Sequence, residues 1–297
     1  LAEQKQLQEL LASDQMQRDQ LKAWFADIKK RYDKKTALGR RRTTWAEQTE
    51  EIVVNTDEFI EKEPLTIILS AMGWIRAAKG TLDLNSLDLK FKEGDELQFA
   101  FHAMSTDKIN LFTSGGKMFT LAANELPSAR GFGESVRLMA DIGADENIVR
   151  AFVLNTGVKY LLVGRHGTGF IVSGENCLAQ TKNGKQVMNT DAANPAIMCV
   201  PVTGDTIAMS GSNDKLLIFG TDEIPEMTRG KGVILQKYNA DRTYVLDVMF
   251  FDAADGFGWT TGRGTTKLDD WAPWRGKRAS QGRTVPLGFP RTGKFTK

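Results

Sequence analysis

The chain contains 297 residues, which allows one or two domains, and its apolar fraction of 41% is ordinary for a globular protein with a sizeable core. No apolar run approaches the ~20 residues of a membrane span, and the first residues show neither the basic start nor the apolar region of a signal peptide. The formal net charge of +2 is too small to indicate nucleic-acid binding by itself. We therefore expect no membrane association and a cytoplasmic location.

Residues 1–32 predict an amphipathic helix. Apolar side chains recur mostly every three or four residues among Gln, Lys, Glu and Asp, at Leu7, Leu10, Leu11, Leu21, Trp24, Phe25 and Ile28. The pattern starts at Leu1 with no capping residue, so we expect the end of a longer helix or coiled coil. Residues 33–64 follow as a basic tether, and Thr43, Thr44 and Trp45 are candidates to open a first strand.

The remainder, residues 65–297, predicts an all-β domain built from repeats. Two short apolar runs flank a glycine-containing turn, as in a β-hairpin, in segments 65–77, 108–121, 159–173, 205–219 and 256–268. Corresponding positions recur at intervals of roughly 40–50 residues, a period typical of propeller blades. We therefore expect a propeller-like ring of about five blades of antiparallel strands.

Four further apolar runs lie between the hairpins, at residues 97–104, 148–154, 197–202 and 244–251. Because each run precedes a hairpin, we predict that one blade comprises the apolar strand, the hairpin after it, and a further strand beyond the next loop. Repeating this unit around an axis leaves only short sheet edges, which limits edge-to-edge aggregation.

A loop with a cation beside a glycine follows each hairpin, as in residues 125–133 and again, one residue longer, in residues 223–232. Glu125 and Glu223 occupy equivalent places before these loops, which indicates a structural role such as pairing with a backbone donor or a neighbouring arginine. The residues from Arg263 onward are strongly basic, whereas residues 47–63 are acidic, so the small net charge conceals a marked asymmetry.

Five periodic basic loops on a curved surface indicate contact with nucleic acid. A DNA duplex carries one negative charge per ~1.7 Å, and Lys or Arg can follow its phosphates without reading sequence. Glycines beside the cations allow close approach of the backbone. A solvated surface charge is the alternative for any single member of the candidate DNA-binding set, which is Arg76, Lys79, Lys117, Arg130, Arg165, Lys182, Lys185, Arg229, Lys231, Arg263, Arg275, Lys277 and Arg278.

The residue types that usually carry catalysis or bind metals are sparse. Cys177 and Cys199 lack the paired spacing of a zinc site or a disulfide framework, so we predict two buried thiols. His102 and His166 have no partner at a ligand spacing, and the carboxylates form no recognisable catalytic pair. We predict no catalytic residue, metal site or cofactor in this chain.

Three runs resemble the C-terminal domain of the A subunit of bacterial topoisomerase IV, at residues 73–80, 126–131 and 286–291. The resemblance extends from about Arg40 to the end of the chain. It implies a β-pinwheel, a propeller-like ring of Greek-key blades that exchange strands, preceded by a coiled-coil helix.

The resemblance also implies a function. In that family the domain binds and bends double-stranded DNA and thereby directs strand passage in decatenation and relaxation. The holoenzyme is an ATP-dependent type II topoisomerase that pairs two A subunits with two B subunits and uses ATP and Mg²⁺. The cleavage tyrosine, the magnesium site and the ATPase of that enzyme are expected outside this chain.

Two alternatives stay open. One is the related C-terminal domain of the gyrase A subunit, which wraps DNA with a contiguous Gln-Arg-Arg-Gly-Gly-Arg-Gly box, whereas this chain has only Ala77-Ala78-Lys79-Gly80 at that place. The other is a propeller that binds proteins through its rim, although the Trp-Asp and Gly-His signatures of WD repeats are missing.

Overall fold

The computed structural model describes residues 2–41, 43, 61–84, 89–239, 242–262 and 264–296. The chain divides into two compact units, Leu1–Asn55 and Thr56–Lys297. Arg42, Thr44, Trp45 and Arg263 lie outside the described residues, so the expectations that concern them stay predictions. Among the described helices, none combines the length and the apolar character that crossing a membrane requires.

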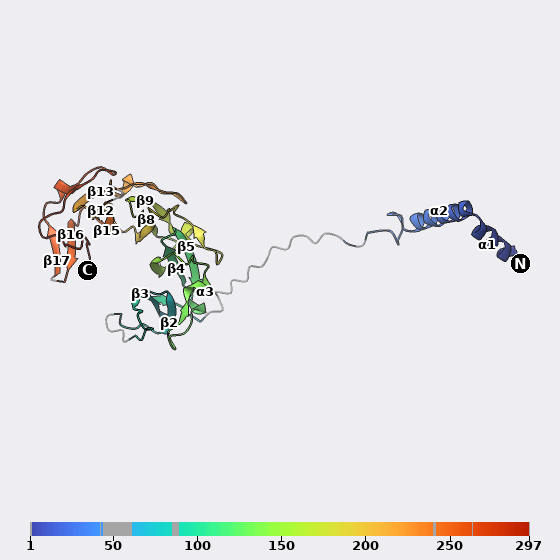
Figure 1. Cartoon of the computed structure of the whole chain (residues 1–297), viewed down its shortest axis with the longest axis horizontal. Helices are drawn as coiled ribbons and strands as arrows, with labels where there is room; N and C mark the ends of the chain where they lie inside the picture. Colours follow the sequence, from blue (N-terminus) through green and yellow to red (C-terminus); the bar gives the residue numbers. More distant parts are fainter. Residues whose placement is uncertain are drawn as a thin grey trace. The chain divides into compact units, whose positions relative to one another are not determined.

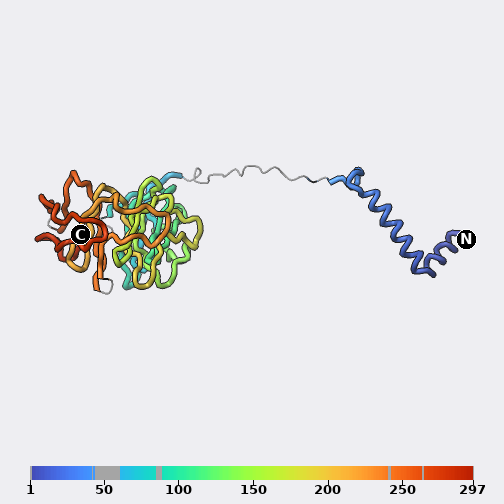
Figure 2. Tube along the Cα trace, turned by 90° about the horizontal axis from the view of Figure 1, so that it is seen from above, coloured from blue at the N-terminus to red at the C-terminus, as the bar shows by residue number. Residues whose placement is uncertain are grey.

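The first unit contains two helices, α1 (Ala2–Ala12) and α2 (Asp14–Arg31), where one continuous helix was expected (Figure 2). The break falls at Ser13, whose backbone is extended and whose hydroxyl accepts a hydrogen bond from the Met16 N–H at 3.4 Å. Serine is a favoured N-cap because this bond satisfies one of the free N–H groups of the first turn. No side chain of either helix is buried within the chain.

The described part of the second unit is all-β, as predicted, and contains four antiparallel sheets of four strands each. Each sheet, which we call a blade, has an inner strand, two hairpin strands and a two-residue outer strand. Blade 1 comprises β3 (Leu97–Met104), β1 (Pro64–Ser70), β2 (Trp74–Lys79) and β6 (Glu134–Ser135). Blade 2 comprises β7 (Ile148–Val153), β4 (Lys108–Thr113), β5 (Lys117–Ala122) and β10 (Lys185–Gln186).

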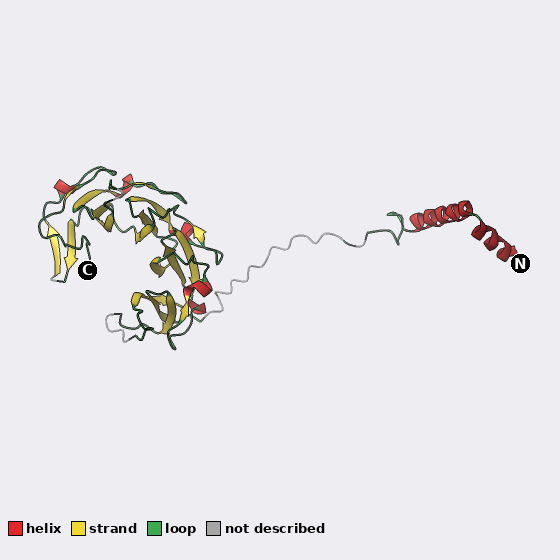
Figure 3. Ribbon diagram, in the orientation of Figure 1, coloured by secondary structure: helices red, strands yellow, loops and turns green. Residues whose placement is uncertain are grey.

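The other two blades repeat this order. Blade 3 comprises β11 (Ala196–Pro201), β8 (Lys159–Gly164), β9 (Thr168–Ser173) and β14 (Val233–Ile234). Blade 4 comprises β15 (Val245–Phe251), β12 (Thr206–Gly211), β13 (Lys215–Gly220) and β18 (Arg283–Thr284). A fifth repeat is present as the two-stranded terminal hairpin of β16 (Phe257–Thr261) and β17 (Gly264–Leu268). Within this unit the sheets follow one another along an arc (Figures 1 and 3).

The predicted grouping of strands into blades was wrong in one respect. Each apolar strand pairs with the hairpin that precedes it in the chain, so that β3 pairs with β1 and β7 pairs with β4. The hairpin before and the hairpin after both offer an antiparallel partner, and sequence order alone does not choose between them. The five hairpins themselves are confirmed at the predicted places.

Outer strands are exchanged between repeats, as the resemblance implied. After the hairpin of one blade the chain crosses back and adds its outer strand to the blade before, so that β6 follows β5 in sequence but pairs with β2. The same crossing places β10 beside β5, β14 beside β9 and β18 beside β13. Every blade therefore depends on the next repeat for its outer strand.

The hydrophobic core lies between consecutive blades. Ile67 and Ile75 of blade 1 and Leu111 and Phe119 of blade 2 share one buried cluster, each at most 1% exposed. Full burial of such a side chain contributes about 1.5–3 kcal/mol, so the contacts between consecutive blades stabilise the arc.

The two ends of the arc have no neighbouring blade among the described residues, and each is covered differently. On blade 1 the Leu82 N–H donates to the Thr66 hydroxyl at 3.0 Å, which attaches the loop that follows β2. On blade 4 the buried residues Ala208, Leu216 and Ile218 pack in one cluster with aromatic side chains of the terminal hairpin and of the chain end, Phe257, Trp259, Phe289 and Phe295.

Candidate nucleic-acid interface

The basic loops are the segments that carry the chain from one blade back to the one before. We call them strap 1 (residues 126–133), strap 2 (178–184), strap 3 (224–232) and strap 4 (275–282). Each begins after a short helix, namely η2 (Ala123–Glu125), α4 (Gly174–Cys177), η3 (Thr221–Glu223) or η4 (Ala272–Trp274), and ends at an outer strand. One further short helix, α3 (Val136–Met139), follows β6.

Backbone hydrogen bonds fix the straps along the edge of the preceding blade. The Ala77 N–H donates to the Pro127 carbonyl oxygen at 2.8 Å, and the Ile171 N–H donates to the Pro225 carbonyl oxygen at 3.0 Å. The straps also donate: the Met227 N–H bonds to the Ile171 carbonyl oxygen at 2.8 Å, and in strap 4 the Gly276 N–H bonds to the equivalent Ile218 carbonyl oxygen at 2.8 Å. These recurring bonds in straps 1, 3 and 4 show that the sequence period is a structural period.

A glycine with positive φ stands immediately before every outer strand, at Gly133 (φ +84°), Gly184 (+72°), Gly232 (+75°) and Gly282 (+78°). A Cβ added at Gly133 would lie 2.2 Å from the Ile75 carbonyl oxygen, and one at Gly282 would lie 2.4 Å from that of Leu216. These glycines therefore permit close approach to the preceding strand and a left-handed turn. At these four glycines the close backbone approach is therefore to the preceding strand of the protein itself.

Most of the strap cations are exposed. Side chains on all four straps reach the surface, at Arg130, Lys182, Arg229, Lys231, Arg275 and Lys277. Lys185, the first residue of β10, and Arg278 are half-buried. The structure therefore brings eight of the predicted residues onto the straps or the outer strand that follows.

Several of these cations are held by neighbouring groups. The Arg229 Nε donates to the Asn189 Oδ1 at 3.2 Å, and the Arg278 Nη1 donates to the Ile234 carbonyl oxygen at 2.8 Å. The Arg278 backbone N–H donates to the Glu223 Oε2 at 2.9 Å, which confirms the structural role predicted for Glu223. The Arg275 guanidinium carbon lies 6.0 Å from the centre of the Trp271 ring, within range of a cation–π interaction.

Arg76 does not belong to an exposed interface, so its predicted role as a direct phosphate contact is corrected. The residue is 5% exposed, and its guanidinium donates to the carbonyl oxygens of Gly131 and, at 3.0 Å, Lys90. Burial lowers the pKa of this guanidinium because the charged form loses hydration. Arg76 thus joins strap 1 to the loop that follows β2.

The remaining predicted residues lie away from the straps. Lys79 ends β2 and forms an exposed ion pair with Glu63 at 2.9 Å, and the hydrogen bond that its ammonium donates to this carboxylate raises the pKa of Lys79. Lys117 begins β5 and is half-buried, and Arg165 lies in the β8–β9 turn with its guanidinium carbon 4.1 Å from the Tyr244 ring centre. The first of the five predicted basic loops is therefore not a strap, because blade 1 has no preceding blade to cross to in the described residues.

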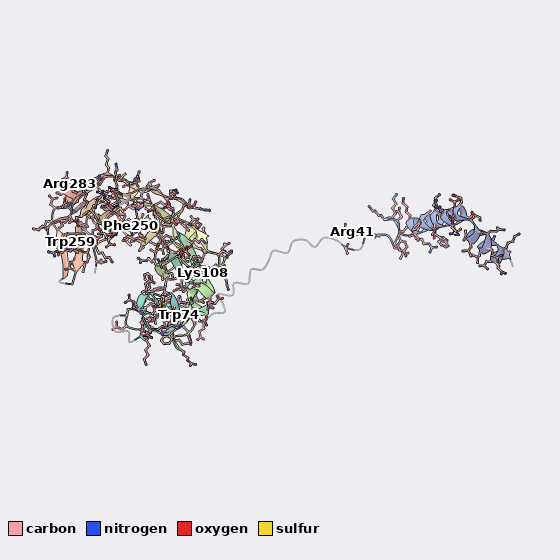
Figure 4. The ribbon with its side chains drawn as sticks, in the orientation of Figure 1. Arg41, Trp74, Lys108, Phe250, Trp259 and Arg283 are labelled. Atoms are coloured by element: carbon pink, nitrogen blue, oxygen red, sulfur yellow. The ribbon has the colours of Figure 1, made fainter. Side chains whose placement is uncertain are left out.

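Exposed cations beside the straps include two that the predicted set left out. Arg283 (labelled in Figure 4) is the first residue of β18, the place that Lys185 takes in β10, and an alignment of the outer strands would have found it. Lys90 is exposed beside the carbonyl that Arg76 binds, and no repeat signal marked it.

Within the described residues, no group of three or more His, Cys, Asp or Glu side chains is arranged to hold a metal ion. Cys177 and Cys199 are buried free thiols, as predicted, and burial raises the pKa of Cys177 to about 12 and that of Cys199 further. Thiols with such pKa values stay protonated and unreactive at neutral pH.

Comparisons with known proteins agree with this architecture. The family model "DNA gyrase C-terminal domain, beta-propeller" matches residues 107–155 and 205–248. Each matched segment contains one hairpin, the strap after it, the outer strand and all or part of the next inner strand. The family repeat is therefore the same unit that the strand exchange defines.

Curated relatives match over most of the chain. The A subunit of DNA topoisomerase 4 from Rickettsia conorii is 42% identical over 272 residues, which are 91% of this chain and 36% of that protein. Its counterpart from Caulobacter vibrioides is 44% identical over 242 residues, which are 80% of this chain and 31% of that protein. The chain thus spans about a third of the length of these relatives.

A solved structure shares the fold. The C-terminal domain of E. coli ParC superposes with a TM-score of 0.66 at 22% identity, and the match covers 77% of this chain and 96% of that domain. The repeat unit, the strand exchange and the relatives point to one family. The chain belongs to the C-terminal domains of topoisomerase IV A subunits, which are related to that of gyrase A.

Proposed function

We propose that this chain binds double-stranded DNA along its straps and bends it, as the C-terminal part of the A subunit of a bacterial type II topoisomerase. The observation that carries the proposal is the repetition of exposed cations on consecutive, structurally equivalent straps. Phosphates repeat along a duplex, so a series of cations fixed on a curved rim suits backbone contact without sequence readout. Arg130 and Arg229 even stand at the same distance from their outer strands.

The proposed catalytic activity belongs to a larger holoenzyme of which this chain is one part. In the proposed holoenzyme two A subunits join two topoisomerase IV B subunits, and ATP hydrolysis with Mg²⁺ drives one duplex through a break in another. The present chain would contribute the bound, bent DNA that selects crossings for decatenation or relaxation. Its location would then be the bacterial cytoplasm, at the nucleoid.

Charge reversal tests the interface. We expect Arg130→Glu, Arg229→Glu and Arg275→Glu each to weaken binding of a duplex of several tens of base pairs, and to lower the slope of log affinity against log salt by about 0.9, as the loss of one phosphate contact requires. Arg18→Glu, which makes the same charge change on exposed α2, is the matched control and should bind as the wild type does. Salt-independent affinity, or an unchanged slope in all three variants, would show that the straps are not the DNA interface.

A gyrase-like wrapping function makes a different prediction. Chiral wrapping of DNA around the isolated chain would leave pronounced positive writhe after ligation of a nicked circle. We expect little writhe, because Lys79-Gly80 stands where the gyrase box has three arginines. Pronounced writhe would favour the gyrase alternative, and a failure to shift DNA in a low-salt gel would favour a rim that binds protein.

A further inference from the structure

The segment that follows an outer strand is hydrogen-bonded through the backbone to the next strap. After β10 the Asn189 N–H donates to the Gly230 carbonyl oxygen at 2.8 Å, and the Gly230 N–H donates to the Val187 carbonyl oxygen at 3.1 Å. After β14 the Lys237 N–H donates to the Ser280 carbonyl oxygen at 2.9 Å in the same way. The segment that follows one outer strand therefore holds the strap that leads to the next.

At the first of these junctions a side chain adds to the backbone pairing. The Asn189 Oδ1 accepts a hydrogen bond from the Arg229 Nε at 3.2 Å, and no acidic group pairs with Arg229 within the described residues. Asn189 is half-buried and belongs to the segment after strap 2, whereas Arg229 is exposed on strap 3. Since this bond uses only Nε, the two Nη groups stay available for a bidentate contact with a phosphate.

We propose that Asn189 is a positioning residue for the DNA contact of Arg229, an inference that rests on the proposed function. A long arginine side chain loses rotamer freedom when it binds a phosphate, and a restraint already present in the free protein reduces that loss. Asn189 supplies the restraint without neutralising the charge. It also links strap 3 to the segment after β10, so the orientation of the strap 3 cation depends on that segment.

A double-mutant cycle on the full 297-residue chain tests the inference, with duplex affinity measured by fluorescence anisotropy over a range of salt concentrations. We expect Asn189→Ala to weaken binding about threefold at fixed salt, the effect of losing one modest hydrogen bond, and to leave the salt slope unchanged because the arginine keeps its charge. Arg229→Ala should weaken binding and also lower the slope by about 0.9. The double variant should bind as Arg229→Ala does, because the two residues act through one contact.

Two further variants separate positioning from folding. Asn147→Ala, at an exposed asparagine between α3 and β7 and outside the straps, is the matched control and should bind as the wild type does. Asn189→Asp keeps the shape of the side chain but adds a carboxylate beside Arg229, so it should bind more weakly than Asn189→Ala and show a lower slope. The backbone bond between residues 189 and 230 does not involve the side chain, so thermal midpoints should stay at the wild-type value.

The outcomes distinguish a failure of the positioning role of Asn189 from a failure of the proposed DNA binding. If Arg229→Ala lowers the slope but Asn189→Ala binds like the wild type, or the two effects add in the double variant, the positioning role is wrong and the DNA interface stands. If Asn189→Asp binds as tightly as the wild type, the positioning role is also wrong. If the wild-type chain does not bind the duplex at low salt, both proposals fail together.

Discussion

Blade 1 and the terminal hairpin stand at opposite ends of the arc, and the outward face of the sheet at each end is covered in a different way (Figure 4, Trp74 and Trp259). In blades 2, 3 and 4, the position equivalent to Arg76 holds Phe119, Phe170 and Leu217, each buried against the blade before. Blade 1 has no such neighbour among the described residues and places a guanidinium there. The far face of blade 4 is instead covered by a cluster of aromatic rings.

The difference shows two solutions to the problem of a terminal repeat. Repeat proteins need end units whose outer face tolerates water. At blade 1 one arginine satisfies two backbone carbonyls and keeps the loop on the sheet, with the Phe91 ring 5.4 Å from its guanidinium carbon. At blade 4 stabilisation comes from apolar burial, with Phe295 1% exposed and its ring 5.9 Å from that of Phe257.

The largest expected effect concerns the aromatic end. Phe295→Ala removes a fully buried ring and leaves a cavity, so we expect the free energy of unfolding to fall by about 3–5 kcal/mol, as measured by urea denaturation. Leu287→Ala, at a fully exposed position nearby in sequence, should leave it unchanged. A loss below about 1 kcal/mol in Phe295→Ala would mean that the chain end does not hold the terminal hairpin.

A smaller loss is expected at the polar end. Arg76→Met should lower the free energy of unfolding by about 1–3 kcal/mol, because the carbonyls of Gly131 and Lys90 lose their donor. Arg130→Met, at an exposed strap position, provides the contrast: it should keep wild-type stability and weaken DNA binding. If Arg76→Met were as stable as the wild type, the two ends would not differ in the way described.

The smallest effect depends on pH and lies at Asp247, which accepts a hydrogen bond from the Phe295 N–H at 2.8 Å. Burial raises the pKa of this carboxyl above its usual value. Its contribution to stability is therefore fully present below the unfolded-state pKa and is lost as pH rises through the folded-state pKa. Acidification from neutral pH should thus stabilise the wild type relative to Asp247→Asn, in urea unfolding curves measured at both pH values. A wild type that loses stability relative to Asp247→Asn on acidification would contradict this sign.

Local patterns made the hairpins and the repeat predictable, because alternating apolar residues around glycine turns are a property of neighbouring residues. The pairing of strands was not predictable in the same way, since β3 and its equivalents could join either adjacent hairpin. The burial of Arg76 was not predictable either, because a cation on a strand is ordinarily expected to be exposed. Its buried position follows only from the register of the hairpins, which makes Arg76 equivalent to Phe119, Phe170 and Leu217 in the other blades. The break at Ser13 was a visible N-cap signal that the continuous apolar pattern concealed.

Most of the candidate interface followed from the sequence period, because the straps carry cations at recurring places. The period did not reveal which positions turn inward, nor that Asn189 meets Arg229, since Asn189 follows the outer strand β10 and Arg229 lies on the next strap. Contacts between repeats depend on the crossing of the chain, which is set by the fold rather than by any local pattern.

The exchange of outer strands also has a consequence for synthesis on the ribosome. The hairpin strand β2 gains its partner β6 only after residue 135 has emerged, by which time the hairpin of blade 2 has been made. Each nascent blade therefore lacks its outer strand until the next repeat has been synthesised, and its unpaired edge is exposed during that interval. Vectorial growth from the N-terminus would close the blades in order, each completing the one already made.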